Sequence, residues 1–173
     1  MKIINNITEK LSDDLQVEIA PHSKVSIAAA YFSIYAYEEL KDQLEKVDAL
    51  RFIFTSPSFL SEPTAKEKRE FYIPRQTREK TLHGSEFEIR LRNEFTQKTI
   101  SKECADWVRR KAQFKSNCTD ETMPGFLAVD SEHPVAYAPI NGFTRADLGC
   151  ERGGNMFSMI QQLDAPESKA YLQ

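Results

Sequence analysis

The stretch MPGFLAVDSEHPVAYAPINGFTRADLGCERGG, residues 123–154, decides how the rest of the sequence is interpreted. It contains two apolar runs, at 125–130 and 134–140, which a polar turn separates. Apolar runs of this length between turn residues are typical of buried strands, so the stretch predicts a two-stranded hairpin. The segment after the hairpin, Asn141 to Arg145, offers an amide, a hydroxyl, backbone N–H groups and a guanidinium, a composition that is suited to binding an anion.

The residues upstream predict a strand, a helix and a second strand. Small and apolar residues continue through 24–33 without alternation, which indicates a strand buried on both faces. A helix at 34–47 follows, with Ser33 as its N-cap, and a strand at 49–56 ends at Pro57. Such a unit is a βαβ crossover with parallel strands. We therefore expect an α/β domain with a mixed sheet of about five or more strands and helices on both faces.

Further elements are predicted from apolar periodicity and from capping residues. They are helices at 7–17, near 63–71, from a capping box at Ser85 and Glu88 onward, and at 100–114, and a strand or short helix at 155–161. On the helix at 100–114, Cys104 and Trp107 are predicted core residues. His22 and His133 flank prolines and are predicted to be exposed.

The composition favours a single cytoplasmic domain that comprises residues 1–173. No run approaches the roughly 18 apolar residues that a membrane span needs, and the first residues lack the apolar core of a signal peptide. The three cysteines show no CxxC spacing, which favours a reduced protein, and the three histidines are not spaced as metal ligands. We expect neither a metal site nor a membrane partner.

The charge is distributed unevenly along the chain. Residues 64–115 contain 14 Lys and Arg against 8 Asp and Glu, a balance of +6 in a chain whose net charge is −3. A basic middle segment is a hint of a surface that faces a polyanion. The alternative is a pair of charged helices that face only solvent.

The order of these features resembles the phospholipase D-like superfamily. In that family a strand pair carries a His-x-Lys motif, then an Asp, and then Gly-Ser-x-x-Asn or the variant Gly-Ser-Ser-Asn-Phe-Thr. The His attacks phosphorus, while the Lys and Asn hold phosphate oxygens and the Ser orients the group. Here Met123-Pro124-Gly125-Phe126 stands in place of His-x-Lys and Asp130 in place of the Asp. Ala138-Pro139-Ile140-Asn141 replaces Gly-Ser-Ser-Asn, with Gly142 inserted before Phe143-Thr144. The resemblance implies a degenerate site with no catalytic residue.

More narrowly, the chain is similar to the phospholipase D-like domain at the N-terminus of certain bacterial Swi/Snf-type helicases. The resemblance is carried by 25–33, by Phe87-Glu88 with Leu91, and by 104–111, 123–126 and 142–155. It implies an accessory domain at the start of a longer DNA translocase that binds ATP and Mg and hydrolyses ATP. The chain itself contains no GxxxxGK[ST] phosphate loop, so we expect no cofactor to bind to it.

Three functions stay open on this basis. The first is nucleic-acid binding, above all to DNA, through a set of basic and polar residues: Arg109, Arg110, Lys111, Lys115, Asn141, Thr144 and Arg145. The second is a dimerisation or protein-interaction module, because the family builds its site from two half-motifs; the partner is then a second copy or the helicase core. The third is a residual phosphodiesterase or nuclease, for which the sequence offers no nucleophile.

Overall fold

The computed structural model of the protein describes residues 2–57, 86–119, 121, 123–151, 158–164 and 167–172. The predicted helix near 63–71, the cap Ser85 and the segment 152–157 lie outside these residues. The described residues form a seven-stranded sheet in the order β1-β7-β6-β5-β2-β3-β4. Its strands are β1 (Lys2–Ile4), β2 (Lys24–Ala29), β3 (Ala49–Pro57), β4 (Ala112–Asn117), β5 (Phe126–Asp130), β6 (Val135–Ala138) and β7 (Ile160–Asp164).

The sheet is mixed, as the sequence predicts. β2 and β3 are parallel, which confirms the βαβ crossover, and β3 and β4 are also parallel. β5 and β6 form the predicted antiparallel hairpin, in which Val129 pairs with Val135. The hairpin joins the parallel half through β5, which runs antiparallel to β2, while β7 and β1 complete the other side.

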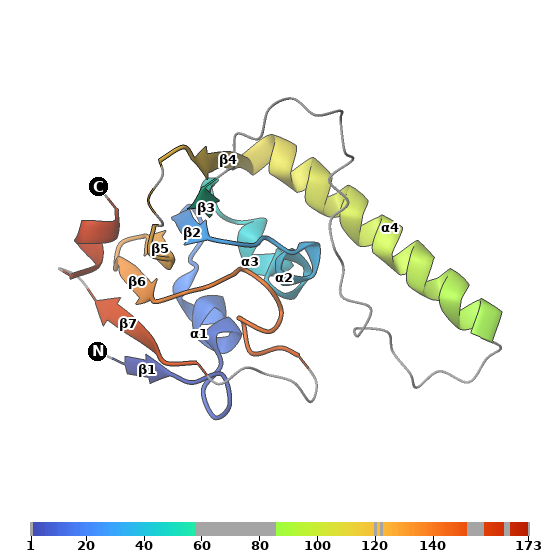
Figure 1. The fold of residues 1–173 in the computed structure, drawn as a ribbon, viewed down its shortest axis with the longest axis horizontal. Coiled ribbons are helices and arrows are strands. Elements are labelled where there is room, and N and C mark those ends of the chain that lie inside the picture. The colour runs from blue at the N-terminus through green and yellow to red at the C-terminus, as the bar shows by residue number, and fades with distance from the viewer. Residues whose placement is uncertain are drawn as a thin grey trace.

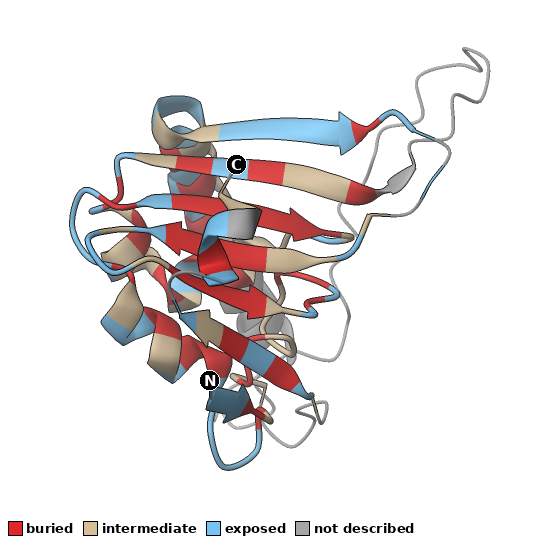
Figure 2. Ribbon diagram, turned by 90° about the vertical axis from the view of Figure 1, so that its left-hand side faces the viewer, coloured by how far each residue is buried: buried red, intermediate tan, exposed pale blue. Residues whose placement is uncertain are grey.

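The helices are distributed differently from the prediction. They are α1 (Leu11–Glu18), α2 (Ile34–Glu39), α3 (Lys41–Leu44), α4 (Glu86–Lys111) and the 3-10 helix η2 (Glu167–Tyr171). Figure 1 shows α1, α2 and α3 on one face of the sheet, which we call the helix face. On the opposite, open face, the part of the chain that the structure describes places only η2 (Figure 2). The prediction of helices on both faces is therefore confirmed for one face only.

The core lies between the helix face of the sheet and the helices that cover it, and it includes Trp107 of α4. Trp107 is 0% exposed, its Nε1 donates to the carbonyl of Leu44 at 2.9 Å, and its ring centroid lies 5.0 Å from that of Tyr37. Truncating an aromatic side chain packed in this way costs about 3–5 kcal/mol. Cys104, one turn earlier, is also buried. Both residues are core residues, as predicted.

The sequence prediction was wrong about where α4 ends. We predicted two helices, the second of which continued to 114, whereas one helix ends at Lys111 and β4 begins at the next residue. Lys111 lies in the last turn, and its Nζ donates to the carbonyls of Glu45 and Val47 at 2.6 and 2.7 Å. The chain then pairs with β3 at once, since Ala112 lies opposite Leu50. Pairing with a distant strand overrides the helical periodicity here.

Other boundaries also differ from the prediction. The helix expected at 7–17 spans Leu11–Glu18, and the strand or short helix expected at 155–161 is a strand over Ile160–Asp164. The helix expected at 34–47 is two short helices, α2 and α3, which meet at Leu40, although Ser33 caps α2 as predicted by accepting from the N–H of Tyr35. The strand expected at 24–33 ends at Ala29.

Candidate nucleic-acid interface

Beyond the end of β2, two distant segments of the chain pair outside the regular sheet. The N–H of Ala30 donates to the carbonyl of Asn141 at 2.9 Å, and that of Phe143 donates to the carbonyl of Tyr31 at 2.8 Å. Phe32 and Phe143 form a parallel bridge, with their rings stacked at a centroid distance of 5.6 Å. The start of β5 lies beside them, because Phe126 pairs with Ala28 at the end of β2. This edge is therefore where the resemblance places the reactive groups of the family.

At this edge Gly125 has no room for a side chain. The N–H of Ile140 donates to its carbonyl at 3.0 Å. A Cβ on Gly125 would lie 1.7 Å from the carbonyl oxygen of Ile140 and 3.1 Å from that of Ala28. Both neighbours are backbone atoms, which cannot rotate away as a side chain can. The segment that stands in place of His-x-Lys is thus packed directly against backbone.

Asn141 and Tyr31 are exposed polar and aromatic side chains at this edge. Asn141 is exposed, and its amide makes no hydrogen bond within the described part of the chain. Tyr31 is 67% exposed, although the sequence placed it inside a strand buried on both faces. That placement was wrong because β2 ends two residues earlier and the chain then pairs with 141–143. Tyr31 is thus an aromatic candidate contact that sequence reasoning missed; its position just after a strand is the signal that could have identified it.

The Thr144 hydroxyl is engaged within its own turn. It donates to the Asp147 carboxylate and accepts from the N–H of Asp147 at 3.2 Å. The same carboxylate limits the space at Gly142, where a Cβ would meet Asp147 Oδ2 at 2.6 Å. In the predicted anion-binding turn, the Thr144 hydroxyl therefore already has its hydrogen-bond partners within the turn.

Arg145 is engaged as well. One of its terminal nitrogens lies 2.7 Å from Glu39 Oε1 and donates to the carbonyl of Cys150 at 3.2 Å. Its Nε is buried and has no hydrogen-bond partner among the described residues. Burial raises the pKa of the Glu38 carboxyl in the same helix, and the neighbouring charge of Glu39 raises this pKa further. An anion at Arg145 would therefore compete with two neighbouring carboxyl groups.

The basic end of α4 is largely bound to the protein itself. Arg110 pairs with Glu45 at 3.3 Å, and Lys111 donates to two carbonyls at the end of α3. Arg109 is the most accessible of the three, with a side chain that is 75% exposed, although it lies 2.9 Å from Asp106. An exposed pair of this kind contributes only about 0–1 kcal/mol, so Arg109 is readily available to another anion.

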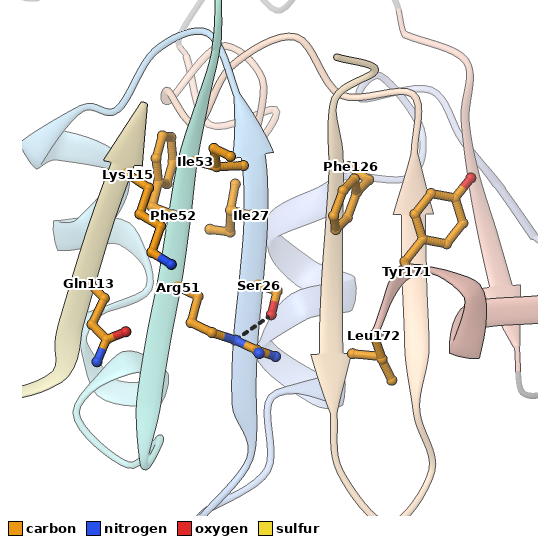
Figure 3. A pocket seen from close by; sticks show the side chains of 10 residues that line it. All are labelled: Ser26, Ile27, Arg51, Phe52, Ile53, Gln113, Lys115, Phe126, Tyr171 and Leu172. Atoms are coloured by element: carbon orange, nitrogen blue, oxygen red, sulfur yellow. Dashed lines mark hydrogen bonds between the residues drawn. The ribbon is translucent and has the colours of Figure 1, made fainter. Parts of the chain in front are cut away.

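Lys115 lies elsewhere, on β4, one residue beyond the predicted end of the helix at 100–114. It is exposed and lines a trough of about 360 Å³ on the open face of the sheet (Figure 3). Arg51 of β3 and Gln113 of β4 line the same trough. Sequence reasoning missed Arg51; the alternation of Arg51 and Ile53 with the buried Leu50 and Phe52 could have revealed it. The seven predicted contacts thus occupy three parts of the fold and do not form one site.

The single His-x-Lys of the sequence, His22-Ser23-Lys24, lies far from this edge. His22 is exposed, as predicted, and its Nδ1 lies 3.0 Å from Asp48 Oδ1. The motif stands where β2 begins, whereas Gly125 and Asn141 lie beyond its end. Six strand residues span about 17–20 Å at roughly 3.3 Å each, so these groups cannot act on one phosphate.

Two features are absent among the described residues. Within them, no three His, Cys, Asp or Glu side chains are grouped so that they could hold a metal ion. Over the same residues, none of the helices combines the length and the apolar character needed to cross a membrane.

No protein-family model matches this chain, and no curated protein matches it significantly. The resemblance to phospholipase D-like domains therefore rests on the order of the motifs in the sequence.

Proposed function

We propose that the chain is a non-catalytic phospholipase D-like accessory domain of a bacterial DNA helicase, and that it binds nucleic acid without cutting it. The observation that carries this proposal is the packing at Gly125. The edge that corresponds to the family's reactive site retains an exposed Asn141, while backbone atoms fill the space beside Gly125. An asparagine amide can hold a phosphate oxygen, but it supplies neither a nucleophile nor a proton.

The accessible cations support the binding half of the proposal. Arg109, Lys115 and Arg51 are exposed, and they lie on α4, β4 and β3. Contacts from cations to phosphates supply most of the affinity of non-specific nucleic-acid binding. Arg110, Lys111, Thr144 and Arg145 are proposed as weaker contacts, because each is already bound to a group of the protein.

The experiment measures whether the domain retains DNA and whether it cuts DNA or a model phosphodiester. The domain is incubated at low salt with labelled single-stranded and duplex DNA, and separately with bis-p-nitrophenyl phosphate, with and without divalent metal. We expect the DNA to be retained and recovered at full length, no nitrophenolate to form, and Asn141→Ala to weaken retention. Cleavage that Asn141→Ala abolishes would contradict the proposal, as would the absence of retention at low salt.

The helicase part of the proposal has its own test. In such a protein the ATPase core would supply the ATP and Mg chemistry, and this domain would help to hold the DNA. The coding sequence beyond Gln173 decides between the alternatives. Helicase ATPase motifs there support the proposal, and a stop codon directly after Gln173 contradicts it.

A further inference from the structure

The trough on the open face is built by four neighbouring strands whose residues are in register. Ser26 of β2 lies opposite Arg51 of β3, which lies opposite Gln113 of β4. Two residues further along, Ile53 lies opposite Lys115. Because alternate residues of a strand point to the same face, these side chains stand together above the sheet. Their positions come from strand pairing and not from a mobile loop.

Arg51 is held so that its terminal nitrogens are free. Its Nε donates to the Ser26 hydroxyl at 3.1 Å, which fixes the guanidinium above β2 (Figure 3). Neither its two terminal nitrogens nor the Lys115 ammonium has a hydrogen-bond or ion-pair partner within the described residues. None of the described residues that line the trough is an Asp or a Glu. This contrasts with Arg110 and Arg145, which are each paired with a carboxylate.

The other side of the trough is aromatic. The rings of Phe126 in β5 and Tyr171 in η2 lie with their centroids 5.0 Å apart, and both side chains are only half-buried. Figure 3 shows them across from Lys115, with Arg51 between the two sides. η2 is fixed to the sheet, since the buried Ser168 donates its hydroxyl to the carbonyl of Pro134 at 3.1 Å. Tyr171 is thus held at the trough by a packed element.

We propose that this trough binds single-stranded nucleic acid, with a phosphate at Arg51 and Lys115 and a base against Phe126 and Tyr171. The proposal deepens the proposed function and rests on it, because it places nucleic-acid binding on a specific surface. A guanidinium with two free nitrogens matches the geometry of a phosphate, and base stacking on aromatic rings is the usual mode of single-strand binding. A volume of about 360 Å³ is within the range of small-molecule sites.

The chemistry of the trough favours a single strand over two other occupants. In a duplex the bases are stacked and paired, so the aromatic side would have no base to contact. An acidic segment of a protein, or of a second copy of this chain, would use the two cations but would leave the aromatic side without a specific partner. A second copy in the trough is one of the outcomes of the test below.

The test compares two double variants of equal charge change by fluorescence anisotropy with a labelled dT oligonucleotide. Arg51→Gln with Lys115→Gln removes both cations of the trough. Lys10→Gln with Lys46→Gln is the control variant. It removes two exposed lysines, one just before α1 and one after α3, on the helix face. We expect the trough variant to bind at least about tenfold more weakly and to lose about 0.7 from the slope of log K against log salt, the value for one phosphate of a single strand. We expect the control variant to change affinity less than about twofold.

A second comparison isolates the aromatic side. The wild-type domain should bind dT more tightly than an abasic strand of the same length, and Tyr171→Ala should remove most of this difference. Thermal melts of every variant check that the fold is intact.

The outcomes separate the two proposals. If wild type does not bind either DNA at low salt, both proposals are wrong. If it binds and the trough variant binds equally well, the trough assignment is wrong and the proposed function stands. An equal loss of affinity in both double variants also contradicts the trough assignment, since it indicates that binding depends on the overall charge and not on these two cations. A dimer seen by light scattering for wild type and lost in the trough variant identifies a second copy as the occupant and overturns the assignment.

Discussion

Replacement of Gly125 by alanine tests the packing that distinguishes this edge from a reactive site. Gly125→Ala would place a methyl carbon 1.7 Å from the carbonyl oxygen of Ile140, whereas ordinary contacts begin at 3.4 Å. The two segments must therefore separate by about 1.7 Å, which breaks the 3.0 Å hydrogen bond from the N–H of Ile140 to the carbonyl of Gly125. Overpacking costs about 1–3 kcal/mol and the lost hydrogen bond about 1 kcal/mol more.

We expect Gly125→Ala to lower the free energy of unfolding by about 3 kcal/mol, and the Tm by about 10 °C at roughly 2–4 °C per kcal/mol. The assay is urea unfolding followed by circular dichroism. Gly142→Ala is the matched control: its Cβ would meet the end of the Asp147 side chain, which can rotate away, so we expect a loss of about 1 kcal/mol. A stability of Gly125→Ala within about 0.5 kcal/mol of wild type would refute the reasoning, as would a larger loss in Gly142→Ala.

Three further predictions concern α4 and the cysteines. Trp107→Ala should lower the free energy of unfolding by about 3–5 kcal/mol in the same assay, because it removes a fully buried ring and its bond to Leu44; a loss below about 1 kcal/mol would contradict this. Lys111→Met should cost about 1–2 kcal/mol, since it keeps the aliphatic stem and removes two hydrogen bonds; unchanged stability would show that these bonds contribute nothing. At pH 8 a thiol reagent should label the exposed Cys118 quickly and Cys104 only on unfolding, because burial raises the pKa of Cys104 to about 11, well above the assay pH; equal rates would be inconsistent with a buried thiol.

The parts of the fold that could be predicted are those that depend on local pattern. The continuous apolar runs of β2 and β3 and the turn residues between β5 and β6 specify strands and a hairpin on their own, and the structure has both. β4 could not be predicted in this way. Its first residue continues the apolar stripe of α4, and only pairing with β3, far away in sequence, turns it into a strand.

The candidate site was predicted in composition but not in arrangement. The polar side chains after β6 are present, yet the sequence does not show that Arg145 meets Glu39 or that Thr144 meets Asp147. These partners come from tertiary packing and from the closure of the turn. Conversely, Arg51 was not predicted as a contact, although it alternates with buried residues of β3 and lines the trough on the open face. Local composition identified suitable groups, and tertiary structure decided which remain free.

The central claim is that this domain binds nucleic acid and does not cut it. The most direct measurement is a salt titration of the wild-type domain against a labelled single-stranded oligonucleotide, with the strand length checked afterwards. We expect binding near about 50 mM salt, a slope of log K against log salt of about −1.4 or steeper from two or more phosphate contacts, and a strand recovered at full length. No binding at that salt concentration, or a shortened strand, would contradict the account.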